Sequence, residues 1–137
     1  MDARKFIVGS VVGGIVYFVL GWLVFGVLLD SVMEGMRTPQ AASIERMQPL
    51  MWAVGVACLL TGVLITYALG SRGGAAAGAK VGAIVGLLLW GASDFMFYGF
   101  TTLSTLSGTI VDPLVSAVVS GIAGAVLGLV VGKMKSA

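Results

Sequence analysis

The sequence predicts an all-α membrane protein, a four-transmembrane-helix bundle with both chain termini in the cytoplasm. Of its 137 residues, 58% are hydrophobic and 10% are charged, whereas a soluble domain carries about 25% charged residues. The apolar residues form four blocks of about 20, the length that crosses a hydrocarbon core as a helix. We therefore expect a single transmembrane domain over residues 1–137.

The four spans are expected at about residues 6–29, 50–69, 80–100 and 112–131. Basic residues then fall mostly on one side of the membrane. The residues on that side are Arg4, Lys5, Arg72, Lys80, Lys133 and Lys135. Arg37 and Arg46, on the opposite side, are balanced by nearby acids. Because loops rich in Lys and Arg stay in the cytoplasm, both termini are predicted there.

The loop between the first two spans is expected to contain a short helix. Thr38 followed by Pro39 is a typical helix start, and Ala41, Ile44 and Met47 recur at helical spacing. We predict an amphipathic helix over about residues 39–48 at the outer interface. It would serve as a lid over the bundle or as a docking surface. The methionines of this loop favour apolar packing over a soft-metal relay.

Small residues recur at every fourth position within three of the spans. Such ridges let helix backbones approach closely, and this is how helices associate in lipid. The residues that we expect to mediate helix packing are Gly9, Gly13, Gly78, Gly82, Gly86, Ser120, Gly124 and Gly128. The fragments VGGIV at Val12 and VGAIV at Val81 also raise the possibility of a parallel internal repeat of two hairpins.

The residue inventory argues against several classes of chemistry. The chain has no histidine and only one cysteine, Cys58, which excludes His/Cys zinc sites, His-ligated haem and His-based nucleophilic triads. We expect no metal, no cofactor and no enzymatic activity. The net charge of +2 is spread along the chain, so we expect no nucleic-acid partner.

Asp94 is the strongest candidate for a functional polar residue, because it lies within the third predicted span. A carboxylate there costs about 3 kcal/mol and normally faces other helices or a wet cavity. Its neighbours on the same helix face are Trp90, Tyr98 and Thr101. Asp94 is either held by hydrogen bonds from Tyr98, Thr101 or another helix, or it is a proton or cation site. We favour the structural role.

Asp112 and Pro113 form a typical helix start, with an acidic cap followed by the favoured first residue. We therefore interpret them as the cap of the fourth span. The hydroxyl-rich run TTLSTLSGT that precedes them is expected to be an outer loop. Its hydroxyl groups are enough to line a polar mouth, but loops are polar in general, so we favour an ordinary loop over a binding mouth.

Several of these segments together resemble a family of small bacterial four-helix integral membrane proteins of unknown function. The segments are VGGIVYFVLGWLVFG, GGAAAGAKVGAIVGLL and SDFMFYGFTTLSTLSGTIVDPLVSAVVSGIAGAVLG. The matching positions are Asp94, Tyr98, Gly99, Thr101, Thr102, Val111 and Asp112. The resemblance implies a four-helix fold in the cytoplasmic (inner) membrane and no particular activity.

Two functional hypotheses follow from the sequence. The first is a non-enzymatic association role, as a homo-oligomer or as an accessory subunit of a larger membrane complex, with membrane lipids around it. The second is a small oligomeric transporter or channel, coupled to protons or cations through Asp94 and Tyr98. An intramembrane enzyme ranks last, because Asp94 and Asp112 are separated by a loop and acid–base chemistry usually needs two adjacent groups.

Overall fold

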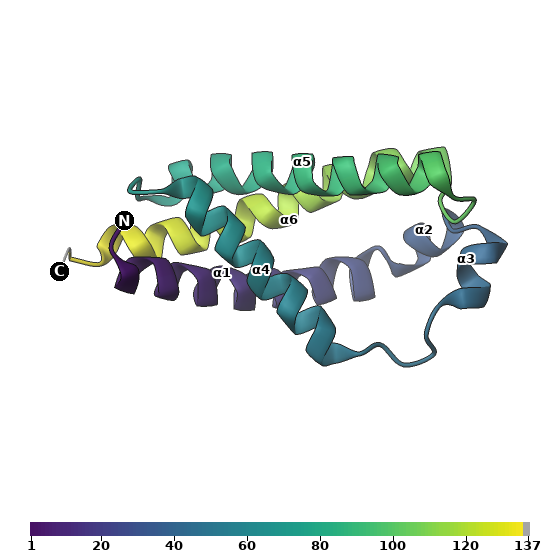
Figure 1. The fold of residues 1–137 in the computed structure, drawn as a ribbon, viewed down its shortest axis with the longest axis horizontal. Coiled ribbons are helices and arrows are strands. Elements are labelled where there is room, and N and C mark those ends of the chain that lie inside the picture. The colour runs from purple at the N-terminus through teal and green to yellow at the C-terminus, as the bar shows by residue number, and fades with distance from the viewer. Residues whose placement is uncertain (136–137) are drawn as a thin grey trace.

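The computed structural model describes residues 1–135 and is all-helical, with 82% helix and no strand in the described part. Four of its helical segments are long and apolar enough to cross a membrane: Ala3–Leu28, Met51–Leu69, Ala75–Phe100 and Leu106–Lys133. The start of the first segment and the end of the last lie at the same end of the molecule (Figure 1). We call this the terminal end and the opposite one the distal end.

The first segment consists of helix α1 (Ala3–Leu23) and a π-helical stretch, η1 (Val24–Leu28). Asp2 caps α1 by accepting a hydrogen bond from the Lys5 backbone N–H at 2.9 Å. The helix therefore begins three residues earlier than the predicted span. A π-helical stretch is uncommon and often marks a functional region. Here it carries Phe25 into the distal half of the molecule.

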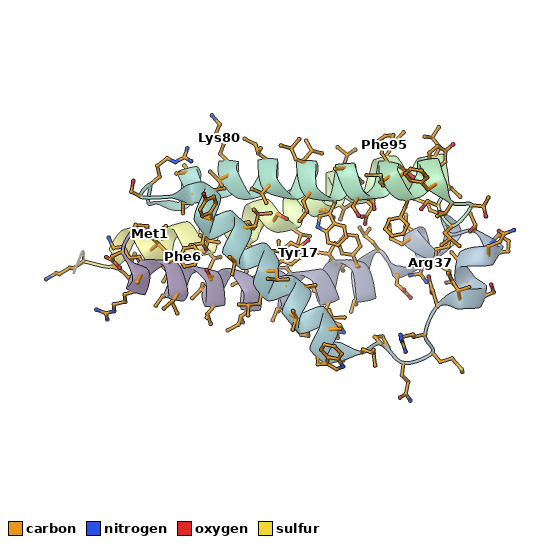
Figure 2. The ribbon with its side chains drawn as sticks, in the orientation of Figure 1. Met1, Phe6, Tyr17, Arg37, Lys80 and Phe95 are labelled. Atoms are coloured by element: carbon orange, nitrogen blue, oxygen red, sulfur yellow. The ribbon has the colours of Figure 1, made fainter. Side chains whose placement is uncertain are left out.

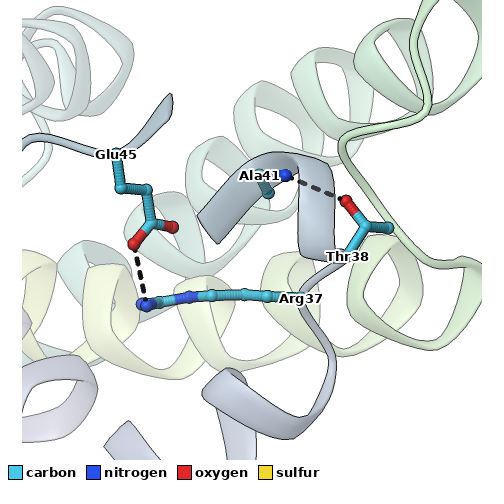
Figure 3. A network of polar contacts seen from close by, with 4 residues as sticks. All are labelled: Arg37, Thr38, Ala41 and Glu45. Atoms are coloured by element: carbon cyan, nitrogen blue, oxygen red, sulfur yellow. Dashed lines mark hydrogen bonds and ion pairs between the residues drawn. The ribbon is translucent and has the colours of Figure 1, made fainter. Parts of the chain in front are cut away.

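The distal connection holds two short helices, α2 (Asp30–Gly35) and α3 (Pro39–Ile44). Thr38 caps α3, as the sequence predicts, and accepts a hydrogen bond from the Ala41 N–H at 3.2 Å (Figure 3). The helix ends at Ile44 and not near residue 48, because Glu45 has an extended backbone. The Glu45 carboxylate then lies 3.0 Å from the Arg37 guanidinium. Helix α2 was not expected from the sequence.

Helix α4 (Met51–Leu69) crosses α1 obliquely, whereas α5 (Ala75–Phe100) and α6 (Leu106–Lys133) run side by side (Figure 1). The crossing of α1 and α4 is close at Gly62, where a methyl group would lie 2.5 Å from the Ser10 carbonyl oxygen. The distal half of α4 then diverges from α5 and α6. The two hairpins that carry VGGIV and VGAIV therefore pack with different geometries.

The small-residue ridges of α5 and α6 face each other. A methyl group at Gly82 would overlap the Ser120 carbonyl, and one at Gly78 would overlap the Gly124 carbonyl. At the end of this interface, the Gly74 N–H donates a hydrogen bond to the Gly128 carbonyl at 2.8 Å. Gly74 has φ +99°, a conformation that side chains rarely adopt. Only small residues permit backbones to approach this closely.

Gly9 and Gly13 of α1 pack on other helices of the same chain. Gly9 lies against Thr66 and Val131, and Gly13 lies against Leu127 and Gly62. Around them is a core of fully buried side chains in the terminal half. Its members with 0% exposure are Ile65, Thr66, Leu69, Ser120, Ala123 and Leu127. The predicted ridges thus close the terminal half of a single chain.

Candidate functional site

Asp112 and Pro113 lie inside helix α6, and the prediction that they cap it is wrong. Helix α6 begins at Leu106, and its cap is Thr105, whose hydroxyl accepts a hydrogen bond from the Gly108 N–H at 3.1 Å. Residues 106–109 of the hydroxyl-rich run are therefore helix, whereas residues 101–105 lie outside it. An Asp-Pro pair is a start signal in soluble helices, but membrane helices tolerate proline in their interior.

The interior proline has a local consequence for α6. Pro113 has no N–H, so the Thr109 carbonyl loses its usual partner four residues on. The Thr109 side chain is 2% exposed, and its hydroxyl donates to the Thr105 carbonyl at 2.8 Å. The first turns of α6 therefore place backbone and hydroxyl oxygens next to Asp112.

The longer α6 brings Asp112 opposite Asp94 on α5. Asp94 and Asp112 line the same cavity, although 18 positions separate them in the sequence. A proton on one of the two carboxyl groups removes the repulsion between them. Without that proton, two adjacent negative charges repel and need a cation between them.

Asp94 does not use the partners predicted on its own helix. Trp90 donates its Nε1–H to the Tyr17 hydroxyl on α1 at 2.8 Å, and the Thr101 hydroxyl donates to the Phe97 carbonyl at 2.7 Å. Tyr98 is 41% exposed. The Oδ2 atom of Asp94 is buried and accepts no hydrogen bond from any residue between 1 and 135.

The two carboxyl groups line a cavity of about 300 Å³ at the distal end, which we call the mouth. Other lining residues come from η1, α2, the residues around Arg37 and the start of α6. Those with polar side chains are Arg37, Ser104, Thr105 and Thr109. Figure 2 shows Arg37 among the short distal helices, where its guanidinium pairs with Glu45. The mouth therefore offers oxygen atoms together with one cationic group that is already paired.

Thr105 also fixes the roof of the mouth. Its hydroxyl donates to the Met36 carbonyl at 2.6 Å, which ties the end of α2 to the start of α6. Met33 and Met36 line the mouth through apolar side chains. Within residues 1–135, no group of three His, Cys, Asp or Glu side chains is placed to hold a metal ion.

A second cavity, of about 370 Å³, lies between α1, α4, α5 and α6, and we call it the groove. Its lining includes Tyr17, Phe25, Cys58, Trp90 and Asp112. Phe25 and Asp112 line both the mouth and the groove. These two residues therefore form the boundary between the two cavities.

Sequence reasoning missed Tyr17, Phe25 and Thr109 as residues of the site. Tyr17 is a buried phenol in the middle of the molecule (Figure 2). A polar hydroxyl inside an apolar span was the sequence feature that could have identified it. Phe25 carried no signal, because one aromatic residue in an apolar block is ordinary packing. The role of Thr109 depends on how far α6 extends before Pro113.

Comparison of the chain with models of protein families, with curated proteins and with solved structures finds no match. The resemblance to small bacterial four-helix membrane proteins therefore stays a prediction. The site has to be interpreted from its own geometry.

Proposed function

We propose that this chain is a small cation-handling membrane protein in which Asp94 and Asp112 together form a proton- or cation-binding pair. The observation that carries the proposal is that these two carboxyl groups, on two neighbouring membrane-length helices, line the same cavity, the mouth. Ionisable groups inside membrane segments typically mark ion or proton pathways.

The oxygen atoms around the pair support ion binding. Hydroxyl groups of Thr105 and Thr109 line the same cavity, and the Thr109 carbonyl is freed by Pro113. Freed carbonyls and carboxylates are the groups with which membrane transporters coordinate cations and protons.

We place both termini in the cytoplasm, with the mouth facing the opposite side of the cytoplasmic membrane. The support is the charge pattern: the chain termini and the turn between α4 and α5 share the terminal end (Figure 1), and most basic residues of the chain lie near them. Lys80, at the start of α5, points outward (Figure 2). Positive charge of this kind retains a membrane end in the cytoplasm.

The association role stays a prediction, but its original basis now supports intramolecular packing. The glycine ridges of α5 and α6 face each other, and those of α1 face α4 and α6. Association with other copies or other membrane subunits would have to use different surfaces. Native mass analysis after extraction in mild detergent would test it, and co-purifying stoichiometric subunits would establish it.

The cation-handling proposal is tested by flux in reconstituted vesicles. Vesicles that contain a fluorescent dye selective for H⁺, Na⁺ or K⁺ are challenged with an inward gradient of that ion. We expect wild-type protein to move at least one of these ions and to lose at least about 90% of that flux as Asp94→Asn or Asp112→Asn, because each variant removes one carboxylate of the pair.

Asp30→Asn is the matched control, because Asp30 is exposed in the first turn of α2 and lies outside the residues that line the mouth. Its flux is expected to match that of the wild type. Absence of flux for all three ions, or equal flux from wild type and both pair variants, would overturn the proposal.

A further inference from the structure

The groove differs chemically from the mouth, although the two cavities share Asp112. Its lining is mostly apolar and aromatic, and Asp112 is the one charged residue among those that line it. Tyr17 and Trp90 meet in this lining through their 2.8 Å hydrogen bond. The groove thus combines a single negative charge with three aromatic rings, those of Tyr17, Phe25 and Trp90.

The position of the groove follows from the fold. The distal half of α4 diverges from α5 and α6 (Figure 1), and Val54, Ala57, Cys58 and Thr61 of α4 form one wall. Gly21 on α1 also lines the groove and contributes no side chain to it. The groove therefore lies within the membrane-length part of the helices, where an apolar molecule would reach it from the lipid.

The lining selects among chemical classes of ligand. A hydrated inorganic ion loses its water shell in an apolar groove and gains few oxygen ligands in return. An anion is repelled by the Asp112 carboxylate, and a neutral apolar molecule leaves that carboxylate without a partner. A cation with an apolar body satisfies both features, because aromatic rings attract cations and the carboxylate supplies the opposite charge.

We infer that the groove bounded by Tyr17, Phe25, Trp90 and Asp112 binds an apolar organic cation, in competition with the proton or inorganic cation held by the Asp94–Asp112 pair. The inference rests on the proposed function and names a substrate class for it. Competition follows from the shared residue: Asp112 cannot serve both cavities with the same charge. Binding of the organic cation therefore releases a proton or an inorganic cation from the mouth.

The first test uses two probes of nearly equal size and opposite charge, tetraphenylphosphonium and tetraphenylborate. In a Trp22→Phe, Trp52→Phe chain, Trp90 is the only tryptophan that remains, so its fluorescence reports the groove. We expect saturable quenching by tetraphenylphosphonium and at least tenfold weaker binding of tetraphenylborate. The Asp112→Asn variant should reduce the phosphonium affinity at least tenfold.

Asp30→Asn is the matched comparison, because it removes the same charge at an exposed residue that lines neither the mouth nor the groove. It should change the phosphonium affinity less than about threefold, since an exposed charge away from the ligand is screened by salt. Equal binding of the two probes, which an occupant such as a lipid chain would give, overturns the inference. Phosphonium binding that is insensitive to Asp112→Asn also overturns it.

The second test requires no substitution, so it holds even if Asp112→Asn does not fold. Cys58 is the only cysteine of the chain and lines the groove. In the native protein, tetraphenylphosphonium should slow labelling of Cys58 by a small neutral thiol reagent at least fivefold, and tetraphenylborate should not. Equal labelling rates with and without the phosphonium contradict the inference.

Failure of the inference and failure of the proposed function give different results. If proton and inorganic-cation flux depends on the pair but tetraphenylphosphonium neither binds nor protects Cys58, only the inference falls. If the flux is also unaffected by Asp94→Asn and Asp112→Asn, both fall. Release of protons on phosphonium addition, abolished by Asp112→Asn, supports both.

Discussion

The terminal and distal halves of the molecule are built from the same kinds of helix but pack in opposite ways. In the terminal half, glycines on α5 and α6 bring the two backbones into contact, and Leu69 and Leu127 are fully buried. In the distal half, α4 diverges, and both the mouth and the groove lie there. Close packing needs only small residues at regular spacing, whereas a site needs that regularity to be interrupted.

The interruptions can be named. The π-helical stretch carries Phe25 to both cavities, and Pro113 removes one backbone hydrogen bond beside the carboxyl pair. The tight layer in the terminal half lies between the mouth and a separate polar cavity at the terminal end, which Lys5 and Ser71 help to line. The distal half therefore carries the mouth and the groove, and the terminal half carries the close contacts that hold the helices together.

The largest effect is expected from filling the contact between α5 and α6. In Gly82→Ala, the new methyl group would overlap the Ser120 carbonyl, and overpacking a close contact costs about 1–3 kcal/mol or more. Thermal unfolding in detergent should show a lower melting temperature or no folded protein. Gly55→Ala is the control, because nothing lies within 4 Å of its new methyl group. An unchanged melting temperature for Gly82→Ala would contradict the packing described for α5 and α6.

A smaller loss of stability is expected where the end of α2 contacts the start of α6, in the roof of the mouth. Thr105→Ala removes the cap of α6 and the hydrogen bond to the Met36 carbonyl. Loss of a helix cap costs about 1 kcal/mol, and loss of the second hydrogen bond adds about 1 kcal/mol. Hydrogen exchange should accelerate in α2 and in the first turn of α6. Thr102→Ala, an exposed neighbour, should leave exchange in both regions unchanged; equal acceleration from both variants would contradict this role.

The Tyr17–Trp90 hydrogen bond is expected to contribute less to stability. Tyr17→Phe deletes the hydroxyl that accepts from Trp90 Nε1, and interhelical hydrogen bonds in membrane proteins are worth about 0.6 kcal/mol on average. The melting temperature in detergent should therefore change little. The fluorescence emission of Trp90, measured in the Trp22→Phe, Trp52→Phe chain, should shift because the indole N–H loses its hydrogen-bond acceptor. An unshifted emission would argue against the bond.

The smallest effect is expected at the surface pair of α3. Arg37 and Glu45 have side chains that are 43% and 47% exposed, and exposed ion pairs contribute less than about 1 kcal/mol. Glu45→Gln should leave the free energy of unfolding within about 1 kcal/mol of the wild-type value. It should also leave the Arg37 guanidinium without its carboxylate partner, so its positive charge repels cations from the mouth. The cation flux should then decrease, and the decrease should be smaller at high salt. A large loss of stability would show that the pair orders the whole distal connection.

Much of this architecture was predictable from the sequence, since four apolar blocks of membrane length and glycines spaced by four residues need no tertiary information. The site was less predictable. Asp94 could be singled out as a carboxylate inside a span, but its facing partner depends on whether helix α6 begins at Thr105 or at Asp112. A local start signal at Asp112–Pro113 competes with a cap at Thr105, and packing against α5 decides between them. The divergence of α4 has no signature in its sequence.

The most direct test of the central claim, that Asp94 and Asp112 form one cation-binding pair, is infrared difference spectroscopy of the carboxyl groups, recorded while Na⁺ or K⁺ is added to the protonated protein. If Asp94 and Asp112 share one proton, either single Asn variant removes the whole protonated-carboxyl signal that wild-type protein loses on cation addition. If the two carboxyl groups act independently, each single variant removes only its own part and the two parts sum to the wild-type signal. That additive result would contradict the paired site.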